Sequence, residues 1–351
     1  MELNNESILK ALEYVIEPDL KKDIVSLGLV SDIRVEGNTV SFKVKSSNPA
    51  MHSRKRLEEA CVHQVRRFLG DDVGVLVDVE ALPSNAERPQ EQRTFLPNIK
   101  KFIAVASGKG GVGKSTICAN LAAGLAKRGY KVGLVDADIY GPSMPLMFDV
   151  TSQKPRVEGT DEQSKMNPVE NYGVKMLSIG FFAEANQAIV WRGPMASKAL
   201  NQMFTDVNWG ELDYMLIDLP PGTGDVHLSI VQQVPLDGAV IVSTPQNIAL
   251  ADARKGIGMF KLDNINVPVL GIVENMSWFT PAELPENKYY IFGKDGAKNL
   301  AEELNTNVLG QIPLVQSIRE SGDVGRPAVL QNDTPQSKAF DEMVDNVLKA
   351  L

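Results

Sequence analysis

A glycine-rich segment at residues 108–116 (GKGGVGKST) fits the pattern G-x-x-x-x-G-K-[ST]. Its glycines allow the backbone to curl around phosphate oxygens so that several N–H groups point inward, and the N-terminus of a following helix adds positive potential. In this pattern Lys114 acts in catalysis by reaching the β- and γ-phosphates, and the hydroxyl of Ser115 ligates Mg²⁺. The segment follows an apolar run and opens a helical pattern, which is the context that the motif requires. The predicted nucleotide-binding residues are Gly108, Lys109, Gly110, Gly111, Val112, Gly113, Lys114, Ser115 and Thr116.

Three carboxylates end apolar runs further along the chain, where a site of this kind needs them. Asp218 occupies the position of a carboxylate that holds Mg²⁺, usually through water. A proline- and glycine-rich loop at 219–225 (LPPGTGD) follows it and is well placed to change state when the γ-phosphate leaves. Asp136 and Asp138 end another run, and a carboxylate there can orient the attacking water. We therefore expect Ser115 and Asp218 to be the metal-binding residues.

A second lysine, Lys109, occupies the second position of the loop, whereas an ordinary phosphate-binding loop has one essential lysine. A lysine in that place points away from the phosphates of its own loop unless it reaches into the site of a facing subunit. One interpretation is a solvated loop lysine. The functional interpretation is a catalytic charge supplied across a homodimer, in the manner of an arginine finger.

The overall composition limits the classes of protein to which the chain can belong. Its 351 residues suffice for about two domains, and 36 Lys+Arg against 44 Asp+Glu give a formal net charge of −8. This acidic balance argues against nucleic acid as a partner, since nucleic-acid binders normally show a basic domain or stripe. No apolar run approaches the length of a membrane span, and the start of the chain lacks the basic region of a secretory signal. With two cysteines, Cys61 and Cys118, a disulfide framework is excluded and a cytoplasmic protein without membrane association is expected.

Residues 1–83 are predicted to form a small α+β domain. Apolar spacing and turn residues indicate the order α-β-β-α-β, with these elements: helix 4–16, strands 28–35 and 39–45, helix 49–69 and strand 74–79. This segment is too short for a nucleotide-binding fold. Residues 84–97 are polar, bounded by prolines and without periodicity, so they are predicted to be a linker.

Residues 98–351 show short apolar runs that alternate with helical stretches. Continuous apolar runs with this spacing are typical of parallel strands that crossover helices bury on both faces. The predicted strands are 102–106, 131–136, 214–218, 238–243, 269–273 and 308–312. The fold class expected for the chain is therefore α/β: a P-loop NTPase domain with a mostly parallel sheet, preceded by the small α+β domain.

Several motifs together resemble the deviant-Walker-A ATPases, the SIMIBI group that includes the nitrogenase iron protein, MinD and ParA. Within it the chain is most similar to the Mrp/ApbC family of iron–sulfur cluster carriers. The motifs that carry this likeness are 108–116 (GKGGVGKST), 136–143 (DADIYGPS), 191–195 (WRGPM), 218–225 (DLPPGTGD) and 273–277 (VENMS). The small domain resembles the iron–sulfur-assembly domain that is often fused to such proteins, through residues 23–30 (DIVSLGLV).

The resemblance implies roles for individual residues. Lys109 matches the signature lysine, Asp138 the switch-I carboxylate near the attacking water, and Asn275 the asparagine that contacts adenine. The loop at 312–315 is then expected to flank the base. The family also implies ATP and Mg²⁺ as ligands, a homodimer, and client apoproteins or iron–sulfur assembly factors as partners.

The chain departs from the family where a cluster would bind. Carriers usually have a Cys-x-x-Cys pair a few residues after the Asn-Met-Ser motif, but residues 278–292 (WFTPAELPENKYYIF) contain no cysteine. The small domain has 47–52 (SNPAMH) where a cysteine is common. An iron–sulfur cluster therefore follows from the resemblance, while its usual thiolate ligands are missing. Cys61 and Cys118 are interpreted as packing residues, and the three histidines share no metal motif.

Two functions are consistent with these observations. The first is an ATP-hydrolysing iron–sulfur cluster carrier that delivers clusters to apoproteins. The alternative is a nucleotide-gated scaffold or loading ATPase that binds client proteins without carrying a cluster. A DNA-segregation role is disfavoured by the acidic balance. The apolar face of the C-terminal stretch, 340–351, is expected to pack on the core, because acidic side chains on its polar face would be repelled by anionic lipid.

Overall fold

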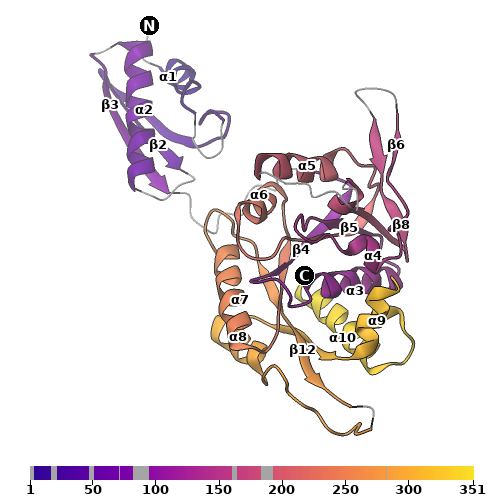
Figure 1. The fold of residues 1–351 in the computed structure, drawn as a ribbon. Helices are drawn as coiled ribbons and strands as arrows, with labels where there is room; N and C mark the ends of the chain where they lie inside the picture. Colours follow the sequence, from indigo (N-terminus) through magenta and orange to yellow (C-terminus); the bar gives the residue numbers. More distant parts are fainter. Residues whose placement is uncertain are drawn as a thin grey trace. The chain divides into compact units, whose positions relative to one another are not determined.

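The computed structural model describes residues 4–16, 22–46, 51–70, 72–81, 95–159, 164–182, 193–281 and 283–351 (Figure 1). Its internal contacts divide the chain into two compact units, Met1–Glu91 and Gln92–Leu351. Most of the predicted linker lies outside the described residues, as do Trp191 and Arg192 of one family motif, residues 47–50, and the side chain of His52.

The first unit has the predicted element order α-β-β-α-β. Its elements are α1 (Asn5–Leu12), β1 (Val30–Glu36), β2 (Thr39–Ser46), α2 (Met51–Leu69) and β3 (Gly74–Ala81). The strands form one sheet in the order β1-β2-β3, in which β1 and β2 are antiparallel and β2 and β3 are parallel. The tight turn between β1 and β2 needs Gly37, whose φ of 60° disfavours residues with a Cβ. Apolar side chains from α1, β2 and α2 bury each other in a separate small core.

The second unit is built on an eight-stranded sheet in the order β13-β12-β11-β4-β10-β5-β9-β8. All neighbouring strands are parallel except the edge pair β8 and β9. The strands of this sheet are β4 (Ile99–Ser107), β5 (Val132–Asp136), β8 (Val169–Asn171), β9 (Val174–Ser178), β10 (Leu212–Asp218), β11 (Gly238–Ser243), β12 (Val269–Phe279) and β13 (Val308–Leu314). The predicted α/β class with a mostly parallel sheet is confirmed.

Helices cover both faces of this sheet, as its apolar strands require. They are α3 (Lys114–Lys127), α4 (Met144–Met147), α5 (Gly193–Thr205), α6 (Asp225–Gln233), α7 (Asn247–Phe260), α8 (Gly296–Leu304), α9 (Gln316–Asp323) and α10 (Pro335–Ala350), with short 3₁₀ turns at Ile179–Phe182 and Ala328–Leu330. Helices α3 and α10 lie side by side, and α7 packs beside α8 (Figure 1). The crossovers through α3 and α7 run in opposite directions along the sheet, so right-handed connections put these two helices on opposite faces.

The sequence patterns did not predict the strands β8 and β9 or the small hairpin of β6 (Arg156–Glu158) and β7 (Lys165–Asn167). β9 has five residues and β8 has three, of which one, Val169, is buried. Such short segments show no period-2 or continuous apolar pattern. They become strands because β9 pairs with β5 and thereby gives β8 an edge on which to pair.

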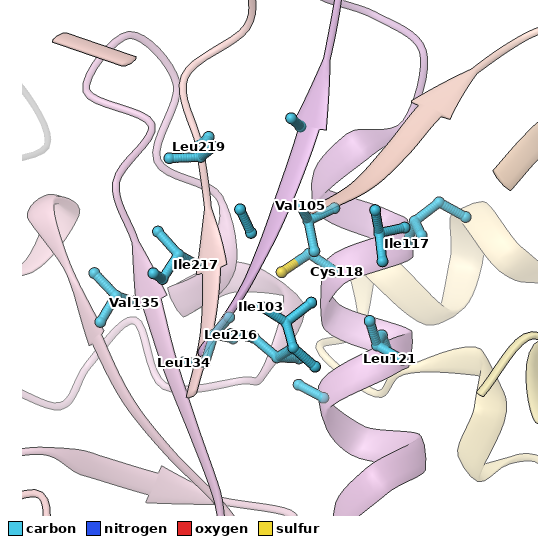
Figure 2. Close-up of a cluster of buried hydrophobic side chains, with 14 of the residues drawn as sticks. Ile103, Val105, Ile117, Cys118, Leu121, Leu134, Val135, Leu216, Ile217 and Leu219 are labelled. Carbon is cyan, nitrogen blue, oxygen red and sulfur yellow. The ribbon is translucent and has the colours of Figure 1, made fainter. Parts of the chain in front are cut away.

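A dense apolar cluster packs between β4, β10 and α3, the helix that follows the glycine-rich loop (Figure 2). Ile103 and Val105 of β4 face Ile117 and Leu121 of α3, and all four side chains are inaccessible to solvent. This packing fixes the angle at which α3 leaves β4, and so determines where the N-terminus of α3 points.

The C-terminal helix α10 is part of the same core. Its apolar residues Phe340, Met343, Val344 and Val347 are fully buried. The expectation that this face packs on the core is confirmed. No helix in the described part of the chain combines the length and the apolar character needed to cross a membrane.

Candidate functional site

The nine predicted loop residues lie together between the end of β4 and the first turn of α3. Gly113, the N-cap residue of α3, has a φ of 84° and offers no capping side chain, so the first N–H groups of the helix have no such partner. Two glycines leave no room for a side chain. A Cβ on Gly108 would lie 2.1 Å from the backbone carbon of Asp252 in α7, and one on Gly113 would lie 2.1 Å from Nδ2 of Asn275. The loop is thus a bare backbone cradle at a helix N-terminus, which suits a phosphate group.

Lys114, Ser115 and Asp218 meet at the carboxyl ends of β4 and β10. The Lys114 Nζ donates to Asp218 Oδ1 at 2.6 Å, and the Ser115 hydroxyl donates to Asp218 Oδ2 at 2.6 Å. Lys114 also lies 3.4 Å from a carboxylate oxygen of Asp138. Burial opposes the positive charge of Lys114, but the carboxylates of Asp218 and Asp138 outweigh it and raise the lysine pKa above its ordinary value. The lysine is therefore charged and ready to pair with a phosphate.

The oxygen atoms of this cluster fit a magnesium ion. Mg²⁺ prefers hard oxygen ligands and is commonly held by one or two protein groups together with phosphates and water. Ser115 Oγ and the carboxylate of Asp218, which is fully buried, supply such oxygens beside the loop. These are the two residues predicted from the sequence to bind the metal, and the structure brings them into direct contact.

Asp136 and Asp138, which end β5, have different surroundings. Asp136 is fully buried, and its carboxylate accepts from the Ser178 hydroxyl at 2.8 Å and from the backbone N–H groups of Met144 and Asp138 at 3.1 and 3.3 Å. Burial, with a contribution from the negative charge of nearby Asp218, raises the pKa of Asp136 to about 7. Asp138 retains 8% of its exposure and accepts from the Tyr140 backbone. Of these two carboxylates, Asp138 is the one that reaches Lys114. Asp136 instead binds the backbone at both ends of the loop between Asp138 and Met144.

Ser178 is a site residue that the sequence patterns missed. It ends β9, one of the unpredicted strands, and its hydroxyl contacts Asp136. A polar residue at the end of the segment 174–178 (VKMLS) was the available signal, but its role becomes visible only when β9 is placed next to β5.

Lys109 belongs to the loop, but its amine is not paired with Asp138 or Asp218. Its side chain is half-buried, and it forms no ion pair with any residue that the structure describes. Its backbone carbonyl accepts from the Ser107 hydroxyl at 2.9 Å, which anchors the loop but leaves the amine unused. The position is consistent with the predicted role in trans, and that role remains a prediction.

Asn275, near the middle of β12, is buried against the loop. Its Nδ2 donates to the carbonyl of Val112 at 2.9 Å. Ile312 of β13 is its partner in the sheet, so the predicted base-flanking segment lies next to it. Adenine contact by Asn275 stays a prediction, and the observed bond ties the amide to the loop that would hold the phosphates.

The segment that replaces the family cysteines forms a hairpin at the end of β12 and exposes both apolar and charged side chains. After Ser277, β12 continues to Phe279, whose backbone exchanges two hydrogen bonds of 2.8 Å with Tyr289. The Lys288 amine lies 4.1 Å from the ring centre of Trp278. Large apolar side chains at the surface of this segment are Leu284, Tyr289, Tyr290 and Ile291.

Neither cysteine is available to bind a cluster in this fold. Cys61 and Cys118 are fully buried in the separate cores of the two units. Figure 2 shows the sulfur of Cys118 among aliphatic side chains. Burial raises the pKa of the Cys61 thiol to about 12 and that of Cys118 well above its ordinary value. The interpretation as packing residues is confirmed, and no group of three His, Cys, Asp or Glu side chains within the described ranges is arranged to hold a metal ion.

Both units match known protein families. Residues 98–348 match the family described as NUBPL iron-transfer P-loop NTPase, and residues 5–77 match a family described as iron–sulfur cluster assembly protein. The iron–sulfur cluster carrier protein of Synechocystis is 42% identical over 343 residues, which cover 96% of this chain and 95% of that protein. An iron–sulfur protein required for NADH dehydrogenase in Arabidopsis mitochondria is 50% identical over 258 residues, 73% of this chain and 80% of that protein.

Solved structures agree with the architecture of the second unit. A nucleotide-binding protein from Archaeoglobus fulgidus in complex with ADP is 38% identical, with a TM-score of 0.60 over 70% of this chain and 93% of that one. The MinD cell division protein of Aquifex aeolicus has a TM-score of 0.51 at 23% identity, over 71% of this chain and 97% of that one. The latter likeness concerns the fold alone.

Proposed function

The chain belongs to the family of NUBPL-type iron-transfer P-loop NTPases, and on this premise we propose that it hydrolyses ATP with Mg²⁺ and delivers iron–sulfur clusters to client apoproteins. The observation that carries the proposal is the contact of Lys114 and Ser115 with Asp218 at the N-terminus of α3. Phosphoryl transfer needs mainly positioning and charge stabilisation, and these groups supply both.

In the proposed reaction each residue does one task. The N–H groups of the loop and Lys114 bind the β- and γ-phosphates, so Lys114 exchanges its contact with Asp218 for phosphate oxygens. Asp218 and Ser115 would hold Mg²⁺, which supplies positive charge against the phosphates when bound. Asp138, whose carboxylate lies 3.4 Å from Lys114, orients the attacking water. Asn275 holds the adenine edge, because an amide both donates and accepts.

We place Lys109 in the site of a second copy of the chain. The charge at the γ-phosphate grows during hydrolysis, and a lysine from a facing subunit would stabilise it. The proposed homodimer therefore assembles around ATP, with the two loops facing each other. Hydrolysis of the ATP would release the bound client.

The second candidate is a scaffold that loads or positions client proteins and carries no cluster. The specific observation in its favour is the burial of both thiols together with the replacement of the Cys-x-x-Cys segment by the hairpin after Ser277. Cluster binding needs accessible thiolates, usually four for each cluster.

Two measurements on the same preparation separate these candidates. The first is steady-state ATP hydrolysis with and without Mg²⁺, with Lys114→Ala as the inactive control. A wild-type protein that hydrolyses ATP no faster than Lys114→Ala would refute the ATPase itself.

The second measurement is anaerobic reconstitution with iron and sulfide, followed by transfer to an apoprotein that takes a four-iron cluster. A brown protein with about four iron atoms per dimer would support the carrier. The Cys61→Ala/Cys118→Ala double variant is the matched control: iron that it loses was held by thiols of this chain, and iron that it retains was not. A colourless wild-type protein that still hydrolyses ATP would support the scaffold.

A further inference from the structure

His227, in the first turn of α6, contacts the loop that follows the metal-binding Asp218. Its Nδ1 lies 3.2 Å from the carbonyl oxygen of Pro220. A carbonyl can only accept a hydrogen bond, so Nδ1 must carry the proton in this arrangement. Nε2 is buried and has no partner among the described residues. Within the part of the chain that the structure describes, the bond to Pro220 is therefore the one polar contact of the ring.

The surroundings of the ring are apolar. His227 is 2% exposed, and its ring centre lies 5.8 Å from that of Phe260, a fully buried residue of α7. The other buried side chains of α6 are aliphatic: Val226, Ile230 and Val231. Burial lowers the pKa of His227 to about 4, so the ring is neutral at physiological pH. An imidazole with an unsatisfied nitrogen is a costly choice for packing alone, because leaving a buried polar atom without a partner destabilises the fold.

The loop needs an anchor on this side. Pro220 and Pro221 have no N–H group, so the loop has few donors of its own. Two bonds to β4 hold its other side, from Leu219 N to Val105 O at 3.1 Å and from Gly222 N to Ser107 O at 2.9 Å. His227 thus adds a side-chain contact from α6 to the proline part of the loop, beside the backbone bond of 3.0 Å from Leu228 N to Gly224 O.

We propose that His227 is a positioning residue for ATP hydrolysis: its Nδ1–H group holds the Pro220 carbonyl and thereby sets the position of the loop between Asp218 and α6. The inference rests on the proposed ATPase function. In this proposal His227 acts only through the Pro220 carbonyl. Without the bond from His227 to Pro220, Asp218 and the glycine-rich loop still bind ATP. The loop that follows Asp218, however, is no longer held in its position beside the γ-phosphate.

The test compares His227→Leu and His227→Phe, which remove the donor, with His227→Asn, whose Nδ2 can occupy nearly the position of Nδ1. We expect the two apolar variants to keep the KM for ATP and to lose kcat about tenfold, the factor that corresponds to one lost hydrogen bond. The Asn variant should recover most of kcat. Unchanged kcat in the apolar variants, or an Asn variant as slow as they are, would overturn the proposal.

A second measurement does not depend on activity. Nitrogen NMR of the histidine rings in the wild-type protein reports which nitrogen carries the proton, with the His227→Asn spectrum identifying the signal. We expect protonation at Nδ1 from pH 6 to 8. Protonation at Nε2 would overturn the inference even in an active enzyme. A wild-type protein with no ATPase activity would instead refute the proposed function, while the tautomer would still report on the bond.

Discussion

The Lys114 ammonium group donates to the Asp218 carboxylate at 2.6 Å, across 104 positions of the chain, and both side chains are buried. A buried ion pair of this kind is costly to break by removing one partner, because the other charge is left uncompensated. In the proposed ATP-bound state, phosphate oxygens would replace Asp218 as the partner of Lys114, and Asp218 would hold the metal.

Lys114→Ala should abolish ATP binding. The neutral N–H groups of the loop alone leave the γ-phosphate charge poorly compensated, and Asp218 then repels it. Binding of a fluorescent ATP analogue at physiological salt measures the effect, with Lys349→Ala, an exposed lysine of α10, as the control. Near-normal affinity in Lys114→Ala would contradict the assignment of the phosphate-binding loop.

Asp138→Ala should bind ATP with near-normal affinity and hydrolyse it about 100-fold more slowly, because positioning of the attacking water contributes mainly in the transition state. Single-turnover hydrolysis measured beside ATP binding separates the two effects. An unchanged rate constant would move the water-orienting role to Asp136, the neighbouring carboxylate.

Lys109→Ala should retain ATP binding as a monomer but lose most hydrolysis and most ATP-dependent dimerisation, because the partner's γ-phosphate would lack its cation. Mixing this variant with Asp138→Ala should restore activity, since one face of the heterodimer pairs an intact Asp138 with an intact Lys109. The ATPase rate is measured across mixing ratios. No activity above the sum of the two variants, despite confirmed heterodimers, would exclude the role in trans.

The carboxyl group of Asp136 should make stability fall as pH rises from about 4 to 7. Its pKa is raised to about 7 in the folded protein, whereas an unfolded chain ionises near the ordinary value of 3.8. Between these values the folded state holds a proton that the unfolded state has released, so raising the pH lowers the free energy of unfolding. Urea unfolding of the wild type and of Asp136→Asn isolates this group. The wild-type free energy minus that of the variant should decrease over this range and then level off; a flat or rising difference would contradict the assignment.

Cys61 and Cys118 should resist alkylation in the native protein. Both thiols are inaccessible to solvent, and burial keeps them protonated at neutral pH. Mass spectrometry after iodoacetamide treatment at pH 8 should find neither modified in buffer and both modified in urea. Modification of either thiol under native conditions would show that it is accessible and reopen it as a cluster ligand.

The sequence alone determined the parts of the site that are local in the chain. The segment 108–116 could be identified as a phosphate-binding loop from its residues alone. Glycines, a lysine and a hydroxyl at fixed spacing define such a loop wherever a strand precedes it and a helix follows. The long apolar runs also identified the central strands and the fold class, since burial on both faces leaves a continuous apolar pattern. The burial of both cysteines and of the apolar face of α10 followed from the same kind of local pattern.

Tertiary structure alone decided which distant side chains meet. The contact of Asn275 with Val112 joins residues 163 positions apart, and the bond from Ser178 to Asp136 depends on a strand too short to show a pattern. The role proposed for His227 is of the same kind. A lone histidine on a helix has no sequence signature, and its possible role becomes visible only in the fold, where Nδ1 lies 3.2 Å from the Pro220 carbonyl oxygen. Sequence patterns record the average surroundings of a residue, whereas a hydrogen bond between separate elements depends on their exact placement, which the packing of the whole sheet sets.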